Sequence, residues 1–184
     1  MNSYKKGTNL VGWLVFLITG TVFFMSVERT GSLWDCGEFI AACYKLQVVH
    51  PPGAPFFLML GKLAIVIGQM FSSDPSVIAF SVNIMSGLAT AAAGMFICWT
   101  TMILGKIALN GRENEPSFPE FIALAGAGIA AGLATAFATS IWFSAVEGEV
   151  YAMSTMCRVA GSDLRTGLHC DARTRLTRDR KSVV

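Results

Sequence analysis

The sequence is poor in charged residues. Only 14% of its 184 residues are charged and 53% are hydrophobic, with a mean hydropathy of +0.56, whereas soluble domains carry about 25% charged residues. This composition argues against a water-soluble globule and against a disordered acidic or basic protein. Only five cysteines are present, which argues against a disulfide scaffold, and no Cys-x-x-Cys or His-x-x-x-His spacing indicates a zinc site.

The charges that are present divide the chain in two. Residues 1–157 hold 7 Lys and Arg against 9 Asp and Glu, whereas residues 158–184 hold 7 against 3. The basic excess therefore lies entirely in an unpatterned tail, which argues against a nucleic-acid partner. We interpret residues 1–157 as one membrane domain and residues 158–184 as a separate tail.

Three long stretches contain no charged residue: 7–27, 77–105 and 121–146. Because a helix needs about 20 apolar residues to cross a bilayer, we expect an all-α, multi-pass membrane domain. Its spans are predicted at about 8–27, 77–104 and 120–145. Lys5 and Lys6 before the first span favour a cytoplasmic N-terminus, and residues 28–54 then form an outer loop.

Two carboxylates stand near the start of a short helix predicted from Asp35 to about Leu46. Asp35 and Glu38, the first acidic pair, are three residues apart and face the same way on a helix. Such a pair can supply a general base and a ligand for a metal or a substrate. The alternative is purely structural, with Asp35 capping the helix and Glu38 completing a capping box.

Other polar residues of the outer loop have a structural and a functional interpretation. His50 precedes Pro51-Pro52-Gly53, a stiff, non-helical corner, and is either a surface histidine or a group that pairs with phosphate. Trp34 is either an aromatic residue of the membrane interface or a surface on which a sugar stacks.

A second acidic pair, Glu147 and Glu149, follows the third apolar stretch directly. These acids lie either at the water boundary or in a polar cavity between helices. Within the spans, Gly128 and Gly132 are four residues apart, which favours close helix packing. Asn83 is predicted to make a structural hydrogen bond rather than to touch substrate.

Segment 55–71 decides the topology. It is apolar but short, and Lys62 interrupts it. If it spans the membrane, the two acidic pairs lie on opposite sides. If it is re-entrant or interfacial, both pairs share one face, and this second arrangement places Lys106 and Arg112 with the N-terminal lysines, as the positive-inside rule prefers.

Several motifs resemble the domain-of-unknown-function 2723 family over roughly residues 8–157. The matching segments are Trp34-Asp35-Cys36-Gly37-Glu38-Phe39-Ile40, Tyr44-Lys45-Leu46-Gln47-Val48, His50-Pro51-Pro52-Gly53-Ala54-Pro55, Trp142-Phe143-Ser144-Ala145-Val146-Glu147 and Glu149-Val150-Tyr151-Ala152-Met153. The family consists of bacterial multi-pass membrane proteins similar to transmembrane protein 260, an O-mannosyltransferase. The resemblance implies the N-terminal part of a type C glycosyltransferase fold, with a helical first outer loop, in a bacterial cytoplasmic membrane.

The resemblance also implies residue roles and partners. Asp35 would be the catalytic base and Glu38 its neighbouring acid, and the remaining matched polar residues would bind substrate: Trp34, Lys45, His50, Glu147, Glu149 and Tyr151. The donor would be a polyprenyl-phosphate-linked sugar and the acceptor a protein or glycan hydroxyl. The resemblance identifies no definite cofactor, and the acids are compatible with a divalent cation. The alternative function is a transporter or assembly factor that uses these acids for protons or cations.

The tail departs from the family pattern. After residue 157 an apolar helix should follow, but the chain becomes rich in Arg, Thr and Asp, and we expect 158–184 to be disordered. Residues 179–184 resemble the translation of a sequencing adapter, which predicts a frameshift or misassembly near residue 157. The alternative is a basic tail that binds anionic lipid. Because a type C site needs more helices than three or four, residues 1–184 alone are expected to be inactive.

Overall fold

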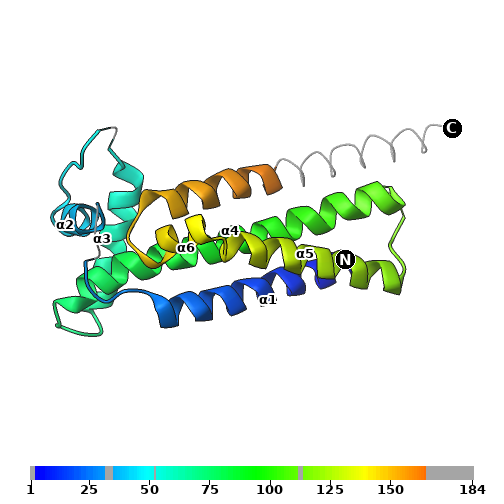
Figure 1. Ribbon diagram of the computed structural model, residues 1–184, viewed down its shortest axis with the longest axis horizontal. Helices are drawn as coiled ribbons and strands as arrows, with labels where there is room; N and C mark the ends of the chain where they lie inside the picture. The colour runs from blue at the N-terminus through cyan, green and yellow to red at the C-terminus, as the bar shows by residue number, and fades with distance from the viewer. Residues whose placement is uncertain (1–2, 32–34, 52, 112–113, 165–184) are drawn as a thin grey trace.

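The computed structural model describes residues 3–31, 35–51, 53–111 and 114–164. These residues form α1 (Ser3–Ser26), α2 (Cys36–Lys45), α3 (Pro55–Gln69), α4 (Ser76–Asn110), α5 (Phe118–Ala136), α6 (Thr139–Val146) and a further helix over residues 150–164 (Figure 1). No strand occurs within these ranges. The predicted all-α class is confirmed.

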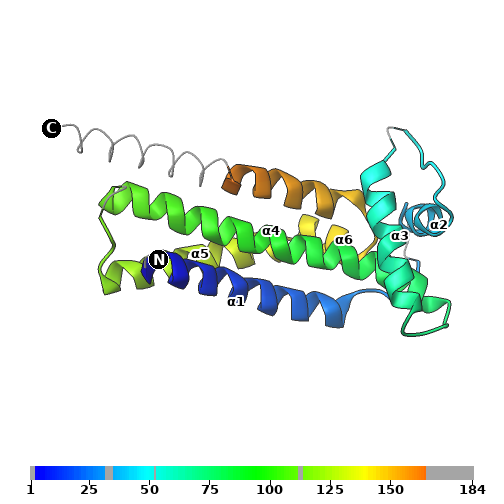
Figure 2. The same ribbon diagram turned by 180° about the vertical axis from the view of Figure 1, so that it is seen from behind.

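Three of the helices are long and apolar enough to cross a membrane, namely α1, α4 and α5. They lie side by side in both views, together with the helix over 150–164 (Figures 1 and 2). The chain is therefore a membrane protein. At 35 residues, α4 is about 50 Å long and exceeds the roughly 30 Å of a hydrocarbon core. Lys106, expected in a loop, belongs to this helix, and its Nζ lies 5.2 Å from the centre of the Tyr4 ring.

One continuous helix was predicted for residues 120–145. The structure instead has two helices in the third apolar stretch. It bends between α5 and α6, where Ala138 has extended backbone angles (φ −58°, ψ 134°). The rings of Phe23, Phe137 and Trp142 pack around the bend with centroids 5.4–6.0 Å apart. Aromatic packing across the chain therefore accompanies the bend, and no Pro, Gly or charge at residues 137–138 marks it in the sequence.

Helix α3 lies across the end of the long helices rather than alongside them, and α2 packs beside it (Figures 1 and 2). A buried apolar cluster joins these elements to α4: Phe39, Ala42, Cys43, Val49, Phe57, Leu58, Ile65, Val82 and Met153. Lys62, the charge within α3, donates from Nζ to the Tyr44 carbonyl at 2.6 Å. Helix α3 thus holds α2 at one end of the bundle.

The helix that begins at residue 150 continues through residue 164, beyond the predicted boundary at 157. Thr100 of α4 donates from Oγ1 to Asp163 Oδ1 at 3.1 Å, so this part of the helix is tied to the bundle. Residues 158–164, expected to be disordered, are thus helical. The remaining residues of the predicted tail, 165–184, lie outside the described ranges.

Glycines allow α4 and α5 to approach closely, as their spacing predicted. A Cβ atom on Gly132 would lie 2.7 Å from the Gly94 carbonyl oxygen and 3.1 Å from Val15 Cγ1, and one on Gly128 would lie 2.8 Å from Met102 Cγ. Contacts this short leave no room for a side chain. Gly126 on the same helix has no atom within 4 Å of such a Cβ.

We expect Gly132→Val to destabilise the bundle by about 1–3 kcal/mol, because overpacking forces the helices apart. The matched control is Gly126→Val, which makes the same change in helix propensity on an open face of α5. Thermal unfolding in detergent micelles, followed by circular dichroism, compares the two variants. Equal midpoints would contradict the packing role of Gly132.

Candidate functional site

The first acidic pair stands at the start of α2, but it does not cap the helix. Asp35 occupies the N-cap position and makes no side-chain capping hydrogen bond. Glu38 lies in the first turn, and both of its carboxylate oxygens interact with His50 instead. The structural alternative, a capping box, is therefore not what these residues form.

A reversal of the chain brings His50 back over α2. Leu46 adopts left-handed angles (φ 53°, ψ 48°) directly after the helix, and the Gln47 N–H donates to the Ala42 carbonyl at 3.1 Å. Val49 is buried in the apolar cluster, which anchors the returning segment. As a result His50, twelve residues after Glu38, lies above the first turn of α2.

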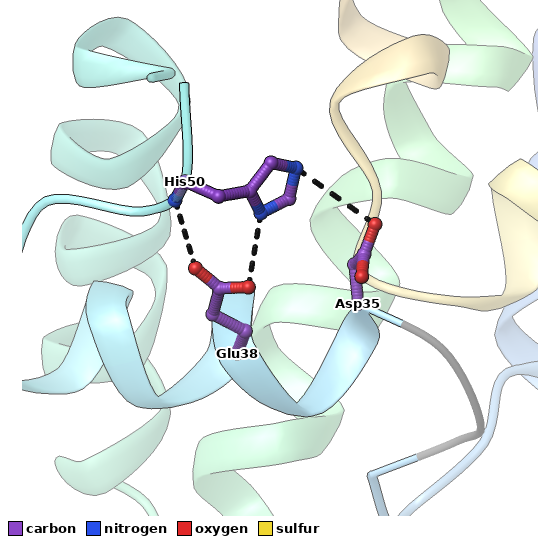
Figure 3. A network of polar contacts seen from close by, with 3 residues as sticks. All are labelled: Asp35, Glu38 and His50. Atoms are coloured by element: carbon purple, nitrogen blue, oxygen red, sulfur yellow. Dashed lines mark hydrogen bonds and ion pairs between the residues drawn. The ribbon is translucent and has the colours of Figure 1, made fainter. Parts of the chain in front are cut away.

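Asp35, Glu38 and His50 form what we term the acid–histidine cluster (Figure 3). The His50 backbone N–H donates to Glu38 Oε1 at 2.9 Å, and the ring Nδ1 lies 3.0 Å from Glu38 Oε2. On the other side of the ring, Nε2 lies 3.9 Å from Asp35 Oδ2. The side chains of His50, Asp35 and Glu38 are 48%, 58% and 44% exposed, so all three are open to a ligand.

The groups of the cluster shift one another's pKa values. The hydrogen bond from the His50 ring, followed by that from the His50 backbone, lowers the pKa of Glu38. The same side-chain bond, followed by the charges of Glu38 and Asp35, raises the pKa of His50. One potential ligand atom from each of the three residues lies within 4.8 Å of the others, so the cluster could hold a divalent cation. When it is protonated, the imidazole itself is a positive partner for the two carboxylates.

Replacing Glu38 should show how strongly its carboxylate raises the pKa of His50. We expect Glu38→Gln to lower the pKa of His50, and Asp35→Asn to lower it less, because Glu38 makes the larger contributions. The raised pKa of His50 and the lowered pKa of Glu38 mean that the pair stabilises the fold fully between their ordinary pKa values, about 4.5 for Glu38 and 6.5 for His50. This stability is lost as the pH rises through the folded-state pKa of His50 or falls through that of Glu38. NMR titration of the His50 ring measures both variants. An unchanged His50 pKa in Glu38→Gln would contradict the pairing.

The second acidic pair lies at the same end of the bundle as the first. Glu147 ends α6 with extended backbone angles. The residue before it, Val146, accepts a hydrogen bond at its carbonyl from the Glu28 N–H at 3.4 Å. Burial, followed by the charges of Glu147 and Asp35, raises the pKa of Glu149. The two acidic pairs therefore influence one another electrostatically.

Two other residues predicted to bind substrate, Lys45 and Tyr151, are not part of the acid–histidine cluster. Lys45 is in the last turn of α2, ten residues from Asp35 and thus about 15 Å away along the helix. Tyr151 is 66% exposed on the helix over 150–164. Trp34 lies outside the described residues.

Sequence reasoning missed two residues that join the two acidic segments. Cys36, directly after Asp35, accepts a hydrogen bond at Sγ from the Gly148 N–H at 3.4 Å. Gly148 is buried between the two acids, and a Cβ there would lie 2.9 Å from both Asn83 Oδ1 and Val82 Cγ1. The small residue between two acids was the only signal in the sequence.

Together the helices and the polar groups define an integral membrane protein with an accessible acid–histidine cluster at one end of its bundle. A match to the Protein O-mannosyl-transferase TMEM260 N-terminal domain covers residues 35–161. The chain belongs to this family. The matched region includes the acid–histidine cluster and the second acidic pair.

Two curated proteins are similar to the chain. Protein O-mannosyl-transferase TMEM260 of Mus musculus is 29% identical over 142 residues, which is 77% of this chain and 17% of the mouse protein. Protein O-mannosyl-transferase tmem260 of Dictyostelium discoideum is 25% identical over 152 residues, or 83% of this chain and 16% of that protein. The chain thus spans about one sixth of the length of these relatives. No solved structure matches it.

Proposed function

We propose that this chain is the N-terminal part of a membrane glycosyltransferase. It would transfer a sugar from a polyprenyl-phosphate donor to an acceptor hydroxyl, on protein Ser or Thr or on a glycan, at the outer face of the membrane. The names of both relatives support a sugar donor and a protein acceptor. The observation that carries the proposal is the Asp35 carboxylate, which is accessible, free of a capping bond and adjacent to His50.

The residues of the cluster suit this reaction. An acceptor hydroxyl has a pKa far above 7, so Asp35 would accept its proton as the new glycosidic bond forms. The bond between the sugar and the phosphate breaks, and its electron pair leaves with the lipid phosphate. A positive group beside that phosphate stabilises the developing charge, and His50 would supply it as an imidazolium. A single displacement inverts the configuration at the sugar carbon, and retention in a product assay would contradict this mechanism.

The proposed topology follows from the same arrangement. We propose that α3 lies at the membrane surface and that both acidic pairs face outward, with Lys5 and Lys6 holding the N-terminus on the cytoplasmic side. A bacterial cytoplasmic membrane is a prediction from the family resemblance, while both matched relatives come from eukaryotes. A transporter or assembly factor is not favoured, because both relatives are named as transferases.

Glycoproteomics tests the proposal. Cells that carry the full-length gene are compared with cells in which it is deleted, and glycopeptides modified on Ser or Thr are quantified. We expect a defined set of these glycopeptides to disappear on deletion and to return on complementation. Unchanged glycopeptides, together with altered proton or cation flux, would support the transporter instead. Purified residues 1–184 are expected to show no turnover on a polyprenyl-phosphate sugar.

A further inference from the structure

Asn83 connects three segments of the chain at the end of the bundle. Its side chain is fully buried in the second turn of α4. Nδ2 donates to the carbonyls of Glu28 at 3.0 Å and of Thr30 at 3.3 Å. Oδ1 accepts a hydrogen bond from the Cys36 thiol at 3.7 Å. The side-chain amide of Asn83 thus binds both the segment that follows α1 and the first residue of α2.

The third connection runs through Cys36. Its Sγ accepts the hydrogen bond from Gly148, and the absence of a side chain at Gly148 lets this backbone approach Asn83. Cys36 is the direct neighbour of Asp35, and Gly148 separates Glu147 from Glu149. The two acidic segments, more than a hundred residues apart in sequence, therefore meet at Asn83.

We propose that Asn83 is a positioning residue that fixes Asp35 relative to the second acidic pair. The inference rests on the proposed glycosyltransferase function, since it assigns Asn83 to that site. An apolar replacement at this fully buried position would remove the hydrogen-bond partner of the buried Cys36 thiol and of the Glu28 and Thr30 carbonyls, which is unfavourable. The segments would then separate locally from α4, while the packing of the long helices would remain.

Cysteine alkylation of the membrane-inserted protein tests the structural step. Each thiol is followed separately by mass spectrometry in Asn83→Leu. We expect Cys36 to react at least about tenfold faster than in the wild type, because loss of its tether favours local opening. Cys98, buried between α1, α4 and α5, should keep its rate. The control is Thr90→Val, since the Thr90 hydroxyl is also buried on α4 but has no hydrogen-bond partner.

Two results would overturn the structural step. An unchanged Cys36 rate would mean that Asn83 does not hold the segment, and an equal acceleration at Cys98 would mean that the whole bundle loosens. Neither result depends on glycosyl transfer. A failure of the proposed function is therefore distinguishable from a failure of this inference.

Transfer by the full-length protein tests the functional step. We expect Asn83→Leu to lower kcat about a hundredfold, because small displacements of reacting groups have effects of that size, and Thr90→Val to leave it unchanged. Cys36→Ser, which keeps a donor and an acceptor, should retain more activity than Cys36→Ala. Full turnover in Asn83→Leu despite faster alkylation of Cys36, or equal activities of the two Cys36 variants, would overturn the positioning role.

Discussion

Replacing Asp35 by Asn is expected to abolish glycosyl transfer by the full-length protein. The amide cannot accept a proton from the acceptor hydroxyl, and removal of a general base lowers turnover by about 10²–10⁴-fold. The fold should persist, because the Asp35 side chain makes no capping hydrogen bond and Asn is itself a favourable N-cap residue. Transfer to a synthetic Ser/Thr peptide in purified membranes measures the loss.

The matched control is Asp74→Asn. Asp74 also precedes a long helix, and its Oδ1 accepts a hydrogen bond from the Ser76 N–H at 2.8 Å, so this aspartate has the structural role that Asp35 lacks. It lies in the turn between α3 and α4, outside the acid–histidine cluster. We expect Asp74→Asn to retain transfer. Retained transfer in Asp35→Asn, with the protein folded, would rule out Asp35 as the base.

Hydropathy was sufficient to predict the long helices, because a helix that crosses lipid needs a long run of apolar residues and such a run is visible in the sequence. It could not predict the bend at residues 137–138. There the chain departs from the helix beside a ring cluster that includes Phe23, more than a hundred residues earlier in the sequence. Such a bend depends on tertiary packing, and no local residue type signals it.

The sequence predicted which residues belong to the candidate site better than it predicted which of them contact one another. Spacing placed Asp35 and Glu38 on one face of α2, but it left capping and function as alternatives. The pairing of Glu38 with His50 depends on the left-handed turn at Leu46 and on burial of Val49, and neither follows from spacing. The meeting of the two acidic segments depends on contacts between residues far apart in the sequence, whereas the charge count favoured one path of segment 55–71 and left the other open.

Lys45 and His50 were both predicted to bind substrate, and each has a basic side chain that could pair with the phosphate. The helix separates them. Lys45 is carried to the far end of α2, whereas the returning loop places the His50 ring between Glu38 and Asp35. His50 is therefore the basic group that lies beside the proposed catalytic base.

We accordingly expect His50→Gln to weaken transfer by about 10–10²-fold, the effect of losing a hydrogen bond to a charged group, and Lys45→Gln to have a much smaller effect. The loss should fall mainly on donor affinity, as measured from the donor Kd and KM. Wild-type affinity should decline as the pH rises through the raised pKa of His50, since the neutral ring no longer attracts phosphate. In His50→Gln this decline of donor affinity at high pH should be absent.

Removal of divalent cations separates this explanation from a metal site formed by the same three residues. With His50 as the positive partner, transfer should persist in EDTA, and the donor affinity should still decline at high pH. Transfer that is lost in EDTA and restored by Mn²⁺ would instead identify a metal ion as the partner of the phosphate. In that case the pH dependence of the wild type would reflect competition between protons and metal for His50, and the loss would be strongest at low pH. The direction of the pH dependence thus decides which positive charge acts at the site.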